Sequence, residues 1–155
     1  MTSSLFRSIL KSGLIIGILD ALAASIYSYV KSTVTPDAVF RYVASGVFGK
    51  EAFTGGLVMI AWGLLFHFII ATGWTMLFYL AYPKFKFLFK SRVLLGISYG
   101  LVVWLMMNLV VVPLSLAPSG PLKFTTGTFS MIMIHMFVIG VPIAFLSSKF
   151  YAKDE

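Results

Sequence analysis

The sequence predicts an all-α, polytopic membrane protein: a bundle of four transmembrane helices with a short interfacial helix between the first two. Hydrophobic residues make up 59% of the 155 residues, and charged residues only 11%. A water-soluble domain of this size could not cover its surface with so few charged side chains. Four apolar runs, each close to the roughly 20 residues that cross a bilayer core, lie at about 11–30, 54–82, 93–113 and 125–148. We expect residues 1–155 to form a single integral membrane domain.

The first run is interpreted as a transmembrane helix and not as a secretory signal peptide. Arg7 and Lys11, followed by an apolar stretch and by Ala21-Leu22-Ala23, imitate a signal peptide with its cleavage box. Asp20 interrupts the apolar stretch just before that box. A signal peptide needs an unbroken apolar core, so we predict that this run is retained as the first span.

The connection between the first two runs carries a helix signal of its own at about 36–46. Thr35 is a suitable N-cap, Pro36 suits the first helical position, and Asp37 complements the positive end of the helix dipole. The apolar side of this helix is formed by Val39, Phe40 and Val43. The pattern is typical of a helix in the membrane interface, and it fits both a lid on the rim of the bundle and a substrate gate.

Prolines and aromatic residues mark the ends of the later runs. Pro83 is expected to end the second run, and Pro142 to kink the fourth near its inner end. The stiff loop expected between the third and fourth runs contains Pro113, Pro118 and Pro121. The aromatic residues expected to anchor the second run at the membrane interfaces are Trp62, Trp74, Tyr79 and Tyr82.

Small residues recur at a spacing of four in the first and third runs: Gly13, Gly17 and Ala21, then Gly96 and Gly100. Such rows let membrane helices approach each other closely. They predict packing seams, either within the bundle or between protomers. In the second case the partner is another copy of the chain or another membrane protein.

The distribution of basic residues predicts the orientation of the chain, whose net charge is +7. With the N-terminus inside, the inner ends carry Arg7, Lys11, Lys84, Lys86, Lys90, Arg92, Lys149 and Lys153. The outer segments carry fewer: Lys31, Arg41, Lys50 and Lys123. The positive-inside rule therefore predicts that both termini are cytoplasmic.

The same distribution argues against nucleic acid as a partner, because the basic residues flank the apolar runs and do not form a one-sided footprint. The inner loop Lys84–Arg92 alternates bases with phenylalanines. This pattern is typical of a segment that binds anionic lipid headgroups while its rings embed in the membrane. Cysteine is absent, which excludes disulfides, iron–sulfur clusters and thiolate metal sites.

Asp20 is the best pointer to function, because a carboxylate inside a transmembrane helix is costly and faces a bundle interior or a wet cavity. His67 and His135 are the only histidines. Counted from the outer helix ends at about 1.5 Å per residue, these three side chains fall within about 6 Å of depth. Asn108 lies somewhat nearer the outer end. We predict one intramembrane polar site of Asp20, His67, His135 and Asn108, with Tyr27 and Ser115 as candidate extensions.

Several chemistries fit an aspartate and two histidines at this depth. The groups can hydrogen-bond across helices and only fix the packing, as in a structural protein or an assembly factor. They can instead relay protons in a small transporter or another proton-coupled membrane protein. His67, His135 and Asp20 can also ligate a divalent metal, or the two histidines can ligate haem b. No nucleophile elbow, paired carboxylates or phosphate loop is visible, so the residues favour a protein that is not an enzyme.

Several short motifs are spread over most of the chain. They are Ser45-Gly-Val-Phe-Gly49, His67-Phe68, Met107-Asn108 leading to Val112-Pro-Leu-Ser115, and His135 followed by Gly140-Val-Pro142. With this set, the sequence resembles an uncharacterised family of small four-helix bacterial inner-membrane proteins. The resemblance implies a location in the bacterial inner (cytoplasmic) membrane and no particular activity.

Overall fold

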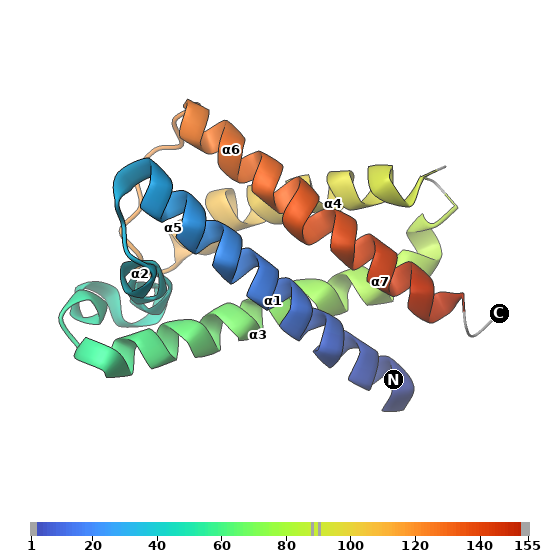
Figure 1. Ribbon diagram of the computed structural model, residues 1–155, viewed down its shortest axis with the longest axis horizontal. Coiled ribbons are helices and arrows are strands. Elements are labelled where there is room, and N and C mark those ends of the chain that lie inside the picture. Colours follow the sequence, from blue (N-terminus) through green and yellow to red (C-terminus); the bar gives the residue numbers. More distant parts are fainter. Residues whose placement is uncertain (1–2, 88, 90, 153–155) are drawn as a thin grey trace.

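The computed structural model of the protein describes residues 3–87, 89 and 91–152, which form helices and loops with no strand among them. Four helical segments are long and apolar enough to cross a membrane, which confirms the predicted fold class. They are Ser3–Ser32 (α1), Gly56–Phe85 (α3), Arg92–Leu114 (the third span) and Thr126–Tyr151 (the fourth span). Consecutive spans run in opposite directions, so both termini lie at one end of the bundle, the terminal end (Figure 1).

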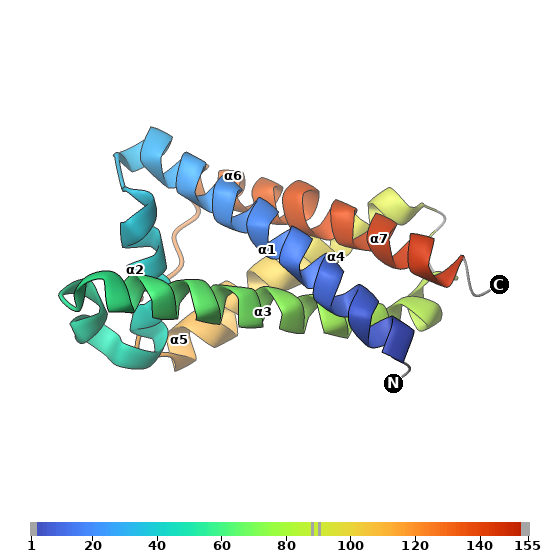
Figure 2. The ribbon, with the colours of Figure 1, turned by 60° about the horizontal axis from the view of Figure 1, so that its bottom comes forward.

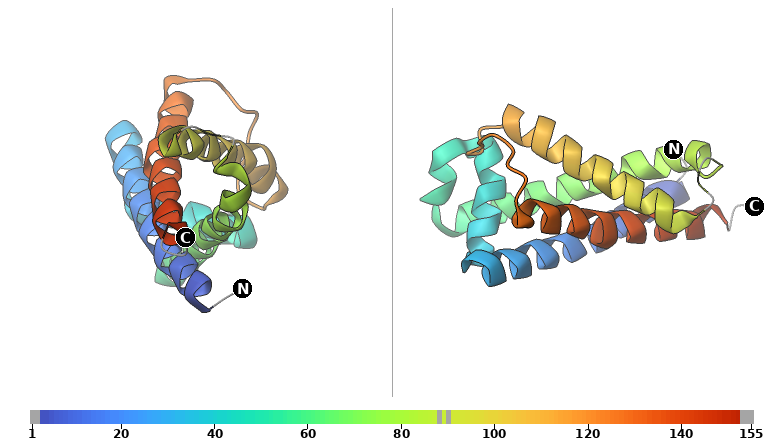
Figure 3. Two further views of the ribbon diagram at one scale, coloured as in Figure 1. Left: turned by 90° about the vertical axis from the view of Figure 1, so that its right-hand side faces the viewer. Right: turned by 90° about the horizontal axis from the view of Figure 1, so that it is seen from above.

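The four spans surround a common interior. Seen along the bundle, they follow one another in the order α1, fourth span, third span, α3 (Figure 3). The apolar core consists of Ile16, Phe78, Tyr82, Leu95, Ile139, Ile143 and Ala144. Every span contributes to this core, as expected of a helical bundle.

The third and fourth spans are each interrupted by a π-helical segment. The third span consists of α4 (Arg92–Met106), the π-helical η2 (Met107–Val111) and α5 (Val112–Leu114). The fourth consists of α6 (Thr126–Ile134), the π-helical η3 (His135–Gly140) and α7 (Val141–Tyr151).

A proline follows each π-helical segment. Pro113 is the second residue of α5, and Pro142 is the second residue of α7. Proline donates no N–H and its ring collides with the carbonyl four residues earlier, so the preceding turn cannot close as an α turn. The wider π turn accommodates the ring. Pro113 therefore lies inside the third span, not in the loop after it as the sequence predicted.

Pro83 does not end the second span, contrary to the prediction. α3 continues past it to Phe85. Pro83 leaves the carbonyl oxygen of Tyr79 without its usual helical donor. The hydroxyl of Tyr151, on α7, donates to that oxygen at 2.9 Å. The missing hydrogen bond is thus supplied by a neighbouring span, and the helix passes the proline.

Three of the four aromatic residues expected at the membrane interfaces lie inside the bundle instead. Tyr79 and Tyr82 are only 1% and 6% exposed. Trp74 donates its indole N–H to the sulfur of Met107 at 3.4 Å. A buried tyrosine or tryptophan is stable where its polar atom finds a partner. Among these four, Trp62 is the exposed one, at 40%.

The predicted interfacial helix is present as α2 (Pro36–Phe48), with Thr35 as its N-cap residue. It ends at Gly49, whose φ of 57° suits glycine. α2 lies across the bundle at the end opposite the termini, the α2 end (Figure 2). A short 3-10 helix, η1 (Gly49–Phe53), leads from it to α3.

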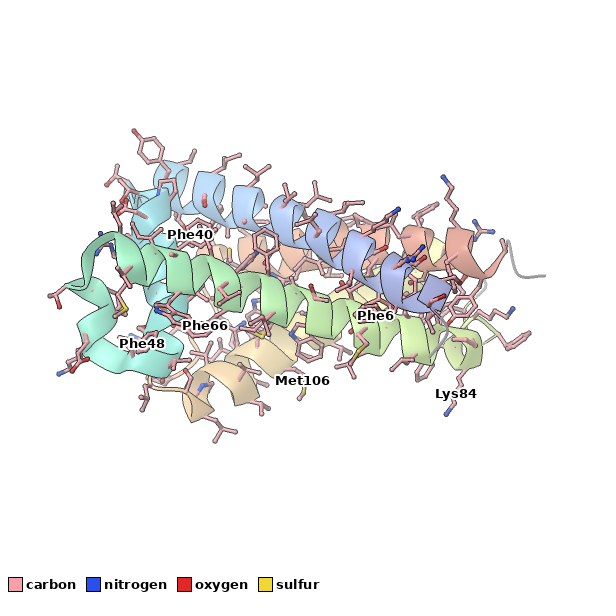
Figure 4. All side chains as sticks on the ribbon, turned by 90° about the horizontal axis from the view of Figure 1, so that it is seen from below. Phe6, Phe40, Phe48, Phe66, Lys84 and Met106 are labelled. Carbon is pink, nitrogen blue, oxygen red and sulfur yellow. The ribbon has the colours of Figure 1, made fainter. Side chains whose placement is uncertain are left out.

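α2 packs closely on α3 and is not a loosely attached surface helix. A Cβ at Gly63 of α3 would overlap the main-chain oxygen of Phe40 of α2, so a glycine is needed at this crossing. The rings of Phe48 and Phe66 lie side by side, with centroids 6.0 Å apart (Figure 4). Both contacts fix α2 against the bundle.

The loop between the third and fourth spans is bonded to α2 as well. The main-chain N–H of Leu116 donates to the carbonyl of Gly46 at 3.0 Å. The hydroxyl of Tyr42 donates to the carbonyl of Pro118 at 3.2 Å. α2 and this loop therefore form one connected cover at the α2 end.

Both predicted rows of small residues lie at seams within the bundle. On α1, a Cβ at Gly17 would lie 2.6 Å from the ring of Phe68 on α3. On α4, a Cβ at Gly96 would lie 2.5 Å from the main-chain oxygen of Gly140 in the fourth span. Real Cβ atoms do not approach other heavy atoms so closely. The absence of side chains at these positions therefore sets the distance between the helices.

Candidate intramembrane polar site

Asp20 and His67 meet where α1 packs on α3. His67 Nε2 lies 4.0 Å from Asp20 Oδ2 and 2.9 Å from the main-chain oxygen of Gly17. A carbonyl oxygen only accepts hydrogen bonds, so Nε2 carries a proton and donates it to Gly17. The side chains of His67 and Asp20 are 12% and 20% exposed. The close packing at Gly17 lets an imidazole on α3 reach both the main chain and the carboxylate of α1.

His135 is the first residue of the π-helical segment η3. Its Nδ1 donates to the main-chain oxygen of Met131 at 2.8 Å. When neutral, each imidazole therefore keeps its second nitrogen as an acceptor: Nδ1 in His67 and Nε2 in His135. π-helical turns within α-helices are frequent at functional sites.

Asp20, His67 and His135 border one internal cavity of about 100 Å³, the central cavity. The rest of its lining is mainly apolar and consists of Ile16, Val43, Ile70, Ala71, Trp74, Val103, Met107 and Ile139. Since one water occupies roughly 30 Å³ in the liquid, the cavity has room for about three water molecules. Water can hydrogen-bond to polar groups that do not touch each other directly. The geometry thus brings together three of the four predicted site residues.

Asn108 and Tyr27 lie outside the central cavity. Both border a separate hollow of about 480 Å³ near the α2 end, together with Lys31. Asn108 Nδ2 donates to the main-chain oxygen of Trp104 at 2.9 Å. The residue before it, Met107, does border the central cavity. Consecutive residues in a helix point about 100° apart. An estimate of depth in the membrane does not say which way a side chain points, so it did not separate Asn108 from Met107.

Ser115 borders a third cavity, which is apolar and has a volume of about 330 Å³ between α2, α3 and the end of the third span. Its hydroxyl donates to the carbonyl of Val112 at 2.8 Å, within a local turn. Val43, Ile70 and Met107 border both this apolar cavity and the central cavity. These three side chains form the partition between the two spaces.

The sequence did not identify the part that α2 plays in the site. The ring of Phe40 packs edge-to-face against the imidazole of His67, with centroids 6.1 Å apart. Val43 borders the central cavity. The spacing of Phe40 and Val43 indicated the apolar side of α2 but not the surface that it covers. Trp74 also borders the cavity, whereas the sequence predicted it as an anchor at the membrane interface.

The arrangement does not fit the metal and haem alternatives. Among the described residues, no group of three His, Cys, Asp or Glu side chains is placed to hold a metal ion. His67 Nε2 donates to the carbonyl of Gly17, which leaves only Nδ1 of that ring as a possible ligand. Pockets for organic ligands span roughly 300–1,000 Å³, whereas the central cavity measures about 100 Å³. It is too small to hold haem between His67 and His135.

A carboxylate and two imidazoles around a space for water can accept and donate protons, because each neutral imidazole carries one N–H and one acceptor nitrogen and a carboxylate is a further acceptor. Comparison of the chain with protein-family models, curated proteins and solved structures finds no match. The chemistry of the site is therefore inferred from these residues alone.

Proposed function

We propose that the chain is an integral protein of the bacterial inner membrane in which the central cavity binds and releases protons during proton-coupled transport. The supporting observation is the Asp20–His67 pair, separated by 4.0 Å, beside a cavity that His135 also borders. A carboxylate within a transmembrane helix costs a few kcal/mol or more, and such residues are typical of proton relays.

The proposed orientation places the terminal end in the cytoplasm. The described basic residues near that end are Arg7, Lys11, Lys84, Lys86, Arg92 and Lys149. Lys90 and Lys153, which the sequence also assigns to it, lie outside the described residues. The excess over the α2 end follows the positive-inside rule. The bacterial inner membrane is inferred from the family resemblance.

The proposed proton exchange uses the hydrogen bonds of the site. His67 keeps a proton on Nε2, facing the Gly17 carbonyl and Asp20, and can take a second proton on Nδ1. His135 can exchange the proton with water in the cavity through Nε2. Phe40 and Val43 of α2 cover the site.

Proton uptake by liposomes tests the proposal. The purified chain is reconstituted with a pH-sensitive dye inside, and a membrane potential is imposed. We expect uptake by the wild type and a loss of at least about tenfold in Asp20→Asn, since the amide cannot ionise. Asp37→Asn is the matched control, because Asp37 is an exposed carboxylate that pairs with Arg41 at 3.4 Å. No uptake by the wild type, or equal uptake by both variants, contradicts the proposal.

A structural role is the second candidate, and a specific observation favours it. His67 and His135 both donate to main-chain carbonyls, and the bond from His67 links α3 to α1. Hydrogen bonds between membrane helices contribute about 0.6–2 kcal/mol each. On this hypothesis Asp20→Asn lowers the unfolding temperature in detergent, while the liposomes show no proton uptake with any variant. A structural or assembly role then replaces transport.

We also propose that the loop Lys84–Arg92 contacts anionic lipid headgroups. Phe87 is 82% exposed, and Lys86 Nζ lies 5.3 Å from the centre of its ring. Leu88 and Lys90 of this loop lie outside the described residues. An exposed ring beside an ammonium group suits the boundary between acyl chains and headgroups.

A further inference from the structure

A hollow of about 270 Å³ lies between α1, α3 and α7 towards the terminal end, and it shares no lining residue with the central cavity. Its polar lining comes from three helices and consists of Ser8, Lys11, Ser12, Tyr79 and Lys149. No carboxylate borders it among the described residues. The hollow, here called the basic hollow, thus presents two ammonium groups and three hydroxyls.

The two lysines are available to an external anion. Lys11 on α1 and Lys149 on α7 are exposed, and neither forms an ion pair with a carboxylate in the described part of the chain. They come from different spans, so a negative group bound between them would join α1 to α7. Two cations facing one space repel each other, and a bound anion removes that repulsion.

The hydroxyls at the floor of the basic hollow complete an anion site. Ser12 Oγ and Tyr79 Oη lie 2.7 Å apart, and both residues are almost fully buried. One hydroxyl donates to the other, and Ser147 is a second side-chain partner of Tyr79, so an external acceptor shares the remaining hydroxyl proton with Ser147. An oxygen of a phosphate group can accept that proton while the lysines balance its charge.

The surroundings favour a lipid over a free anion. Leu146 and Phe150 border the basic hollow, and so does Ile15, which is 44% exposed. These side chains offer a path for an acyl chain along α1 and α7. Basic pockets between transmembrane helices near one membrane face are typical headgroup sites. We propose that the basic hollow binds the phosphate of an anionic phospholipid between Lys11 and Lys149.

The test compares two lipids on the full chain. Wild-type protein is placed in nanodiscs of phosphatidylcholine with increasing phosphatidylglycerol, and the bound lipid is counted by native mass spectrometry. Each lysine near a membrane surface is worth about a fivefold change in affinity. We expect the double variant Lys11→Gln/Lys149→Gln to bind phosphatidylglycerol about 25-fold more weakly than the wild type.

Three controls make the result specific. Arg7→Gln removes an exposed basic side chain of α1 that lies at the same end but borders neither the basic hollow nor the loop Lys84–Arg92, and it is expected to retain binding. Lys11→Arg/Lys149→Arg keeps both charges and is expected to retain binding even if the glutamine variant folds poorly. Inorganic phosphate should not raise the unfolding temperature as phosphatidylglycerol does.

Several outcomes overturn the proposal. They are equal retention of the two lipids by the wild type, undiminished phosphatidylglycerol binding in the glutamine variant, and an equal loss in Arg7→Gln. Stabilisation by inorganic phosphate alone would also overturn it, since it would indicate a site for a soluble anion. The test does not depend on proton transport, because lipid binding is measured without any ion gradient.

Discussion

The two main seams of the bundle are built differently. Between α1 and α3, Gly17 faces a side chain, because a Cβ there would meet the ring of Phe68 at 2.6 Å, whereas Gly13 faces both the side chain and the Cα of Thr72. Between α4 and the fourth span, glycine faces main chain on both sides, at Gly96 and Gly140. The α1–α3 seam also carries polar links, from Ser12 to Tyr79 and from His67 to Gly17.

This difference separates a rigid seam from one that is adjustable around Gly17. A side chain opposite a glycine can rotate, whereas two main chains in contact cannot move apart without separating the helices. Asp20 and His67, the proposed proton site, lie on the adjustable seam. A site that changes charge and hydration needs neighbours that can move, and the seam between α4 and the fourth span provides the fixed frame around it.

The largest effect is expected from Gly140→Ala. A Cβ at this position would overlap the main-chain oxygen of Gly96, and neither backbone can yield. We expect a loss of about 3 kcal/mol in the free energy of unfolding, measured by denaturation with sodium dodecyl sulfate in mixed micelles. Gly73→Ala is the control, because no heavy atom lies within 4 Å of a Cβ there. Equal stability of the two variants would show that this seam is not closed by backbone contact.

A smaller effect is expected from Gly17→Ala. The new methyl group would press on the ring of Phe68, which can rotate away, so we expect a loss of about 1–2 kcal/mol. In the double variant Gly17→Ala/Phe68→Leu a smaller side chain replaces the ring, which should restore part of the stability. A double-mutant cycle measures the coupling between the two positions. If Gly17→Ala is as damaging as Gly140→Ala, the proposed contrast between the seams is wrong.

The smallest effect is expected from Tyr79→Phe, which removes the hydroxyl that lies 2.7 Å from Ser12. A hydrogen bond between membrane helices contributes about 1 kcal/mol, so the same unfolding assay should show a loss of that order. Tyr29→Phe is the control, because Tyr29 is 58% exposed. A loss no greater than the control's would mean that glycine packing alone holds the α1–α3 seam.

The spans could be predicted because every side chain that faces the hydrocarbon of the bilayer must be apolar. Long apolar runs with basic flanks therefore identified four spans, and Thr35 with Pro36 identified the start of α2. The spacing of Gly13 and Gly17 indicated close packing but not its partner. Many surfaces can meet a row of small residues, and only the fold specifies α3.

The site could be predicted only as far as depth determines it. Asp20, His67 and His135 were recognised as costly side chains at a common level of the membrane, and they border one cavity. Asn108 was grouped with them by depth, but its direction depends on η2. Pro83 was expected to end a helix because the donor to Tyr79 comes from Tyr151, which is distant in sequence.

The two π-helical turns determine how the third and fourth spans respond to the insertion or deletion of a residue. Each turn contains about one residue more than an α turn, so all residues beyond it are rotated by about 100° relative to an unbroken helix. Removing one residue from η3 would return the fourth span to α-helical phase. α7 would then be rotated about its own axis, and Ile143 and Ala144 would leave the core. The extra residue in η3 therefore sets the rotation at which α7 packs against the other spans.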